Sequence, residues 1–401
     1  MRSKYFLWAI LCFNAQLLNA QIEDITFRRI SPPGGFSFQA IDIIEQDLFG
    51  YIWMGGFDGV IRYDSKKIVR FRHDPDAENG LPSDRITAMV IDRRNNIWVG
   101  TDKGVCLFNH TLQRFEIVDY TYESGEAANN QINSMALDGS GNLWISDLNY
   151  FGVLHRDNNT LVRLTEGLRN APRLLYKDET NRLWLGTNNG SVYLVLPDEK
   201  RVEMKIDGLG SITRTIYVNN KEIWVGYESH GARLYNLDGK LLTHYAYPLN
   251  PEFDLKTASI RKIWRDTRAR IWIGSYLGLF LIDGTKLIHF DQDRHDGLPH
   301  NSIYEIFEDR QGGIWIGTWS GGISYLHHAD NKFSNYRHSK DSTSLSHNMV
   351  SSFVETPRGD ILVGTERNGL NRFDLKTKNF RKVKVFEHEG ISVSYTHLTL
   401  P

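Results

Sequence analysis

The chain has 401 residues, of which 41% are hydrophobic and 24% charged, so intrinsic disorder is excluded. Lysine and arginine number 47 against 48 aspartates and glutamates, and this formal net charge of −1 gives no electrostatic footprint for nucleic acid or an anionic membrane surface. The 34 glycines, with 10 Trp, 18 Tyr and 20 Phe, predict many short strands joined by tight turns.

Residues 1–20 are predicted to be a secretory signal peptide. Arg2 and Lys4 provide a positive start, residues 5–13 are almost wholly apolar, and Ala20 ends a small-residue cleavage site. The apolar run is too short for a membrane anchor, and a buried N-terminal strand or helix is the alternative. Export and cleavage would leave Cys106 as the one cysteine, so no intramolecular disulfide is expected.

Eight similar segments follow, each centred on a tryptophan or, in the last, a leucine. Successive centres lie 45, 46, 40, 40, 48, 43 and 47 residues apart, which is the spacing of four-stranded propeller blades. The tryptophans are expected in the core between adjacent blades, and the glycine two residues on is expected to leave room for the neighbour. The centres are Trp53, Trp98, Trp144, Trp184, Trp224, Trp272, Trp315 and Leu362.

Each repeat is interpreted as four strands, with the second repeat as an example. An alternating apolar run at 86–91 precedes a turn at 92–95, the tryptophan strand, a third strand at 105–108 and a polar outer strand at 114–118. Aspartate suits the first position of such a turn, because its carboxylate accepts a backbone N–H two residues on. No repeat contains an uninterrupted amphipathic stretch of twelve residues, so helices are not expected.

Known catalytic and metal motifs have no support in the sequence. The histidines are scattered without zinc-ligand spacing, and no glycine-rich phosphate loop opens a helix, so neither a metal nor a cofactor is expected. A glycosidase acid–base pair could be hidden among the acidic residues. Turn formation alone nevertheless accounts for the repeated aspartates, and their D-x-x-G turn differs from the D-x-G-x-x-W box of sialidase-like propellers. The aspartates are Asp47, Asp92, Asp138, Asp178, Asp266 and Asp309.

A ligand site is expected on the face shared by the second-to-third-strand turns and the blade-to-blade loops, where a propeller's channel opens. Aromatic rings there suit the C–H face of a sugar, while carboxylate, amide, imidazole and guanidinium groups suit its hydroxyls. For each candidate the alternative is a solvated or inter-blade packing residue. The candidates are Phe57, Asp58, Asn149, Tyr150, His230, Tyr276, Trp319 and Arg367.

Two stretches carry a family resemblance. Residues 297–309, continuing to 312–318, resemble the two-component regulator propeller repeat, and residues 80–86 open another copy in the same way. The resemblance covers nearly everything from about residue 40 to residue 386. Such repeats build the periplasmic sensor of hybrid two-component systems, in which a sensor histidine kinase is fused to a response regulator.

The resemblance implies a periplasmic, ligand-sensing region that binds an oligosaccharide and signals to a downstream histidine kinase, with the full-length protein tethered in the inner membrane. Its implied partners are the oligosaccharide and the second propeller, membrane span and kinase of the full-length chain, and homodimer formation is left open. No kinase motif occurs in this chain, so it is not expected to be an enzyme itself. The alternative is a stand-alone secreted propeller acting as a polysaccharide lyase, a glycosidase or a protein-interaction platform.

The expected fold is an all-β propeller of four-stranded antiparallel blades. Residues 21–336 are predicted to form seven blades, with residues 25–30 completing the last one, and residues 337–390 the first blade of a second, truncated propeller. A single eight-bladed ring is the alternative. Residues 391–401 resemble translated adapter sequence, so the chain is interpreted as a fragment.

Overall fold

The computed structural model describes residues 25, 27–30, 40–77, 79–126, 131–155, 157–245, 254–292, 298–327, 336–339, 341–375 and 377–383. They fall into two compact units: the ring unit, Ile25–His328, and the C-terminal unit, which includes Ala329–Pro401. Every regular element in these ranges is a strand, which confirms the all-β prediction. Among the described residues no helix has the length and apolar character needed to cross a membrane. The predicted signal peptide (1–20) and adapter-like tail (391–401) lie outside the described residues.

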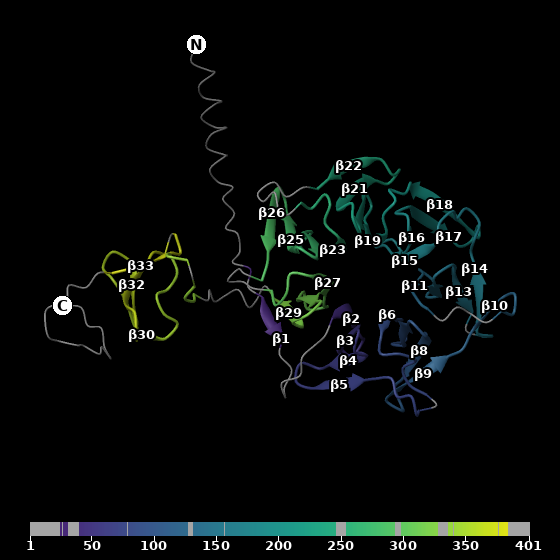
Figure 1. Ribbon diagram of the computed structural model, residues 1–401, viewed down its shortest axis with the longest axis horizontal. Coiled ribbons are helices and arrows are strands. Elements are labelled where there is room, and N and C mark those ends of the chain that lie inside the picture. Colours follow the sequence, from purple (N-terminus) through teal and green to yellow (C-terminus); the bar gives the residue numbers. More distant parts are fainter. Residues whose placement is uncertain are drawn as a thin grey trace, which may run out of the picture. The chain divides into compact units, whose positions relative to one another are not determined.

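The described strands of the ring unit form seven sheets, which are arranged around a common centre (Figure 1). The first two sheets are β2 (Ile41–Gln46), β3 (Ile52–Gly56), β4 (Val60–Tyr63) and β5 (Ile68–Phe71), then β6 (Ile86–Ile91), β7 (Ile97–Thr101), β8 (Gly104–Asn109) and β9 (Arg114–Val118). The third is β11 (Ser134–Leu137), β12 (Leu143–Ser146), β13 (Phe151–His155) and β14 (Thr160–Arg163), to which β10 (Thr121–Tyr122) adds in parallel.

The remaining four sheets repeat this order from the centre outward. They are β15 (Pro172–Lys177), β16 (Leu183–Thr187), β17 (Val192–Leu196) and β18 (Arg201–Ile206); β19 (Thr213–Val218), β20 (Glu222–Tyr227), β21 (Ala232–Asn236) and β22 (Leu241–His244); β23 (Ile260–Arg265), β24 (Ile271–Ser275), β25 (Gly278–Asp283) and β26 (Lys286–Phe290); and β27 (Ile303–Glu308), β28 (Ile314–Thr318), β29 (Ile323–Leu326) and β1 (Arg28–Ile30).

The ring is closed by the two ends of the unit. β1 pairs antiparallel with β29, so the N-terminal strand supplies the outer strand of the last sheet, as expected for residues 25–30. Ile25 and Phe27, just before it, are buried against Trp272 and Phe290 of the preceding sheet. The first strands contact one another in the order β2, β6, β11, β15, β19, β23, β27 and back to β2. The described first strands of the ring unit therefore form a continuous circuit.

Neighbouring sheets pack through the tryptophan strands. The seven repeat tryptophans are at most 6% exposed and belong to apolar clusters shared by adjacent sheets. A Cβ added to Gly55 would lie 2.7 Å from Cγ2 of Ile86, the first residue of the next sheet's inner strand, and Gly274 stands in the same relation to Ile303. The expectation that this glycine leaves room for the neighbour is confirmed, because a methyl group there would overlap the adjacent sheet.

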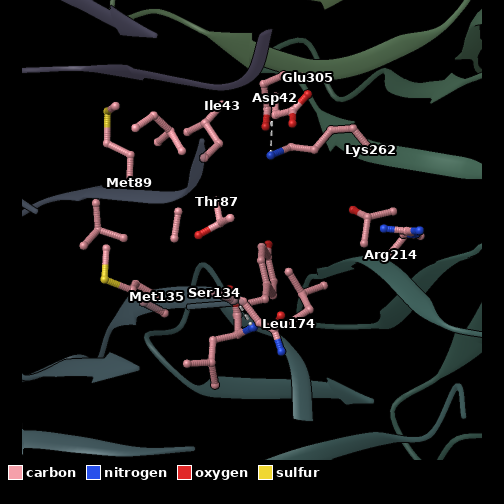
Figure 2. A pocket seen from close by; sticks show the side chains of 18 of the residues that line it. Asp42, Ile43, Thr87, Met89, Ser134, Met135, Leu174, Arg214, Lys262 and Glu305 are labelled. Carbon is pink, nitrogen blue, oxygen red and sulfur yellow. Dashed lines mark hydrogen bonds and ion pairs between the residues drawn. The ribbon is translucent and has the colours of Figure 1, made fainter. Parts of the chain in front are cut away.

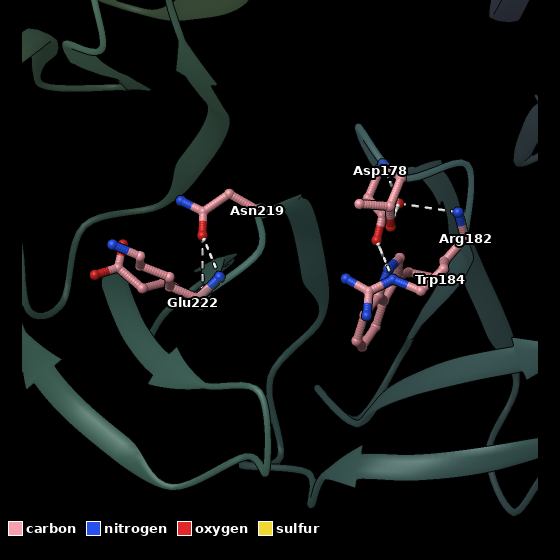
Figure 3. Close-up of polar contacts among 7 residues, drawn as sticks. Asp178, Arg182, Trp184, Asn219 and Glu222 are labelled. Carbon is pink, nitrogen blue, oxygen red and sulfur yellow. Dashed lines mark hydrogen bonds and ion pairs between the residues drawn. The ribbon is translucent and has the colours of Figure 1, made fainter.

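The turn aspartates hold the tryptophans from inside the same repeat. In Asp178, Oδ1 accepts the backbone N–H groups of Thr180 and Arg182, while Oδ2 accepts the indole N–H of Trp184 at 2.8 Å (Figure 3). The aspartate is therefore both a turn former and the acceptor for a buried indole. The same indole bond, at 2.8–3.0 Å, joins Trp53 to Asp47, Trp144 to Asp138, Trp272 to Asp266 and Trp315 to Asp309.

The fifth repeat departs from this arrangement. Its turn begins at Asn219, only five residues before Trp224 instead of six, and the amide oxygen accepts the N–H groups of Lys221 and Glu222. Glu222 now supplies the carboxylate that accepts the indole N–H of Trp224, at 3.3 Å. In the shorter turn the buried indole therefore still has a carboxylate acceptor, which comes from Glu222 rather than from the residue that opens the turn.

The described part of the C-terminal unit holds one further sheet of β30 (Val350–Glu355), β31 (Ile361–Thr365), β32 (Gly369–Phe373) and β33 (Phe380–Lys382). Leu345, Phe373 and Phe380 form its small core, with Tyr336 packed on them. Phe353 is 77% exposed, although the corresponding residue of each first strand in the ring unit is buried. This sheet has the strand order of the ring-unit sheets.

Candidate functional site

A cavity of about 770 Å³, called here the central channel, lies among the first strands of the ring unit. Figure 2 shows side chains from several sheets, including Asp42, Thr87 and Arg214, around it. Because each sheet presents its first strand to the centre, the channel wall is a ring of equivalent positions from consecutive repeats. The volume is within the range of pockets that hold small molecules.

One position of the first strand is special because the strand bulges there. In six of the seven sheets the register with the second strand shifts by one residue near the start of the first strand. A bulge leaves its extra residue unpaired and re-aims the side chain, and bulges are frequent beside functional sites. The equivalent positions, here called the bulge ring, are Asp42, Thr87, Asn133, Arg173, Arg214, Arg261 and Tyr304, all on the channel wall.

Three consecutive repeats place an arginine in the bulge ring. Arg173 donates from Nη1 to Oδ1 of Asn133 at 2.7 Å, and Arg214 forms an ion pair with Glu228. Burial, together with the like charges of Arg214 and Arg85, lowers the pKa of Arg173. The positive charges of these guanidinium groups therefore repel one another at the channel wall.

Aromatic rings cluster beside the bulge ring. The indole of Trp319 stacks on Tyr304 with ring centroids 5.4 Å apart at 28°, and Phe57 meets the indole edge-on at 5.2 Å. Arg261 lies over Tyr304 and Arg85 over Phe57, each with Cζ 4.4 Å from the ring centroid. We call Phe57, Tyr304 and Trp319 the rim cluster. Trp319 remains 43% exposed.

Backbone hydrogen bonds hold the turn that carries Trp319 against the loop that leads into the first strand of the same sheet. The sequence predicted that such turns and loops share one face. Trp319 donates its backbone N–H to Ser302, just before β27, and Glu228 donates likewise to Ile212, just before β19. Each bond ties a second-to-third-strand turn to the segment that leads into a first strand. The turns and the bulge ring therefore lie at the same end of the sheets.

Carboxyl groups with raised pKa values occupy the same channel. Burial raises the pKa of Asp42 to about 6, although Arg85 and Arg261 oppose the shift, and burial raises that of Glu45 to about 7 against the effect of Lys262. Within the described residues, Oδ1 of Asp42 and Nε of Arg261 have no hydrogen-bond partner. Buried polar atoms of this kind are rare unless water or a ligand completes them.

The sequence-predicted ligand residues are not all brought together. Phe57 and Trp319 meet in the rim cluster, whereas Asp58 is held in ion pairs with Arg70 and Arg72. The backbone N–H of Asn149 donates to Asp147 within its turn, and Tyr150 packs against Tyr122 and the guanidinium of Arg163. His230 is half-buried beside Ser229, Tyr276 is exposed, and Arg367 belongs to the C-terminal unit.

The bulge ring was missed by sequence reasoning, although a signal for it exists. Every member stands five residues before the residue that opens the next turn, as Arg173 does before Asp178. This column of Asp, Thr, Asn, three Arg and Tyr directly follows a column that is isoleucine in five of the seven repeats. Among the described residues no group of three or more His, Cys, Asp or Glu side chains is placed to hold a metal ion.

Solved structures of other proteins have a fold similar to that of this chain. The extracellular domain assigned to hybrid two component system BT3049 of B. thetaiotaomicron matches with a TM-score of 0.70 at 21% identity, over 90% of this chain and 49% of that one. The corresponding domain of BT4673 from the same organism gives 0.61 and 21%, over 89% and 53%. Virginiamycin B lyase from Staphylococcus aureus gives 0.56 and 15%, over 72% and 94%. The ring unit is a β-propeller of four-stranded antiparallel blades.

Two stretches of the ring unit match a family model. Residues 80–103 and 297–320 match the model described as two component regulator propeller. No curated protein matches the sequence. The chain spans about half the length of the extracellular domains that it matches.

Proposed function

We propose that this chain is the exported, ligand-sensing part of a hybrid two-component system, and that an oligosaccharide binds at the rim cluster and bulge ring. One observation carries the binding proposal: Trp319 presents a partly exposed indole, stacked on Tyr304, beside a channel lined by polar side chains. An aromatic face suits the C–H surface of a sugar ring, and the polar groups beside it suit the hydroxyls. The family of the repeats supports the sensor role.

The bulge ring supplies hydrogen-bonding groups of both kinds. Asp42 and the side-chain oxygen of Asn133 accept, and Thr87 and the arginines donate. Oδ1 of Asp42 and the Thr87 hydroxyl have no partner among the described residues, so a bound hydroxyl would satisfy them at little cost. Of the eight residues proposed from sequence, Phe57 and Trp319 are therefore retained as contacts.

The proposed sensor is longer than the ring. We propose that the ring unit is a seven-bladed propeller and that residues 337–390 begin a second one, which supplies the missing neighbour for the exposed Phe353. A membrane span and a histidine kinase would follow in the full-length protein, which would be periplasmic and tethered in the inner membrane. Genomic sequence that continues into further repeats, a span and kinase motifs supports this proposal, whereas a native stop codon after Pro401 contradicts it.

Ligand binding is tested by calorimetric titration of the purified chain with a panel of oligosaccharides, comparing wild type with Trp319→Ala. Loss of the indole is expected to weaken binding about tenfold, equivalent to about 1.4 kcal/mol. Tyr276→Ala is the matched control, because Tyr276 is an equally exposed aromatic at the same turn position of the preceding blade. Equal losses in both variants would contradict the rim cluster as the site.

A stand-alone enzyme is the second candidate function. Its support is the pair of channel carboxyls with pKa values raised into the range of a general acid, Asp42 and Glu45, together with the likeness of the fold to a lyase. Incubation with polysaccharides should then release product, and Glu45→Gln should abolish that release. Product release that survives this substitution assigns the chemistry to other residues.

A further inference from the structure

We propose that the mouth of the central channel is an anion site, built from Arg85, Arg173, Arg214 and Arg261, and that the oligosaccharide it binds carries carboxylate or sulfate groups. The proposal rests on the proposed function and narrows its ligand class. It uses residues that come from four different sheets or from the segments leading into them.

The charges at the mouth are unbalanced. Six cationic side chains line the channel, against four carboxyl groups and a fifth, Glu228, that Arg214 engages beside it. The cations are Arg85, Arg173, Lys177, Arg214, Arg261 and Lys262, and the lining carboxyls are Asp42, Glu45, Asp102 and Glu305. The lowered pKa of Arg173 arises from burial and from the positive charges of Arg214 and Arg85, which an added anion would offset. The chain as a whole is nearly neutral, so this excess is a local feature.

Three of the four arginines form no ion pair among the described residues, although the charges of Arg85 and Arg261 reach Asp42. Arg173 donates to a neutral amide, that of Asn133, while Arg261 and Arg85 lie over aromatic rings. Nε of Arg261 is buried and has no hydrogen-bond acceptor within the described ranges. Guanidinium groups packed on rings keep their edge N–H donors directed sideways, where a planar carboxylate or a sulfate can accept two bonds at once.

The bulges fix the backbone positions of these arginines before any ligand binds. Arg173, Arg214 and Arg261 stand at the bulges of three consecutive first strands, and the bulge fixes the backbone from which each side chain extends. Fixed donors lose less conformational entropy when a ligand binds. The adjacent Trp319 provides the apolar surface that free inorganic anions do not need, which favours an acidic sugar over a simple ion.

The anion site is tested first with inorganic sulfate, because this probe needs no knowledge of the sugar. Wild-type protein is titrated with sodium sulfate by calorimetry at constant ionic strength, set with sodium chloride. Saturable binding is expected, weakened at least about tenfold in Arg173→Gln and in Arg261→Gln. Arg114→Gln makes the same change of charge on an exposed outer strand and should bind as wild type. Absence of saturable binding, or equal loss in Arg114→Gln, overturns the proposal.

The sugar class is tested with acidic oligosaccharide pools from polygalacturonate, hyaluronan and chondroitin sulfate, each paired with its methyl-esterified or desulfated counterpart. At least one acidic pool should bind about tenfold more tightly than its neutral counterpart, and Arg173→Gln should remove the difference. Binding confined to neutral sugars overturns the anion site but preserves the proposed function. Sulfate binding without binding of any sugar overturns the proposed function and leaves the anion site standing. Thermal unfolding of each variant verifies that it is folded.

Discussion

Nζ of Lys262 lies 2.6 Å from Oε1 of Glu305, and this ion pair joins two neighbouring first strands across the channel wall (Figure 2). Both residues follow a bulge directly, so their side chains occupy equivalent places in consecutive repeats. Burial raises the pKa of Glu305, and the ammonium group of Lys262 opposes that shift.

Removing one partner of this ion pair should cost more stability than removing both. Lys262→Met leaves a buried carboxylate without its cation and should lower the free energy of unfolding by about 1–3 kcal/mol at pH 8. The double variant with Glu305→Gln should be more stable than the sum of the single effects predicts. Urea unfolding of the four proteins measures the coupling, and strictly additive losses would show that the pair contributes nothing.

Glu45 should make the protein less stable as the pH rises. Burial raises its pKa to about 7 from an ordinary value of 4.5, with Lys262 and Lys177 opposing and Glu305 reinforcing the shift. The folded chain therefore holds this proton more tightly than the unfolded chain. Its contribution is full below pH 4.5 and is lost as the pH rises through about 7. Glu45→Gln should reduce the loss between pH 5 and pH 8 by about 1–2 kcal/mol in urea unfolding. An unchanged slope would contradict this assignment.

Asp178 should behave in the opposite way. Burial works against its charge, but hydrogen bonds from Trp184, Thr180 and Arg182 prevail and lower its pKa. The carboxylate therefore stabilises the fold above pH 4, and this contribution is lost as the pH falls. Asp178→Asn should cost about 1–3 kcal/mol at pH 7, with the difference from wild type shrinking below pH 4. The exposed Asp76 is the control, and Asp76→Asn should change stability by less than about 0.5 kcal/mol.

Gly55 should tolerate no side chain while Ile86 is present. A Cβ on Gly55 would lie 2.7 Å from Cγ2 of Ile86, so Gly55→Ala should lower stability by about 1–3 kcal/mol through overpacking between two sheets. Ile86→Ala removes the overlapping methyl group at the expense of a cavity. The double variant should be more stable than additivity predicts, as measured by thermal unfolding, and a larger than additive loss would place the strain elsewhere.

Much of the fold is predictable because each repeat uses the same local physics. The turn aspartate, the buried tryptophan and the glycine after it recur at nearly constant spacing, so strand order within a sheet follows from the sequence. Even the outer strand of the last sheet was anticipated, because residues 28–30 resemble an outer strand without a sheet of their own. The fifth repeat, where Asn219 opens a shorter turn, shows that the pattern survives a changed acceptor.

The candidate site is less predictable, because it depends on register and on neighbours. In the sequence Arg173 is one polar residue among many, and only the bulge at its position places it on the channel wall. Tyr304 stacks on the indole of Trp319, a contact between a first strand and a turn that the sequence does not indicate. Conversely, Asp58 looked available, but Arg70 and Arg72 from the adjacent outer-strand region pair with it.

The pairing of Arg28 with Tyr325 joins two ends of the ring unit that lie far apart in the sequence. Every other sheet of the ring unit takes its strands from one short stretch of chain and can assemble as that stretch becomes available. The last sheet must bring together segments almost 300 residues apart, and the entropy of closing so long a loop is spent before its contacts form. We therefore expect β1 to pair late in folding, and until it does the edge of β29 stays open to strands of other chains.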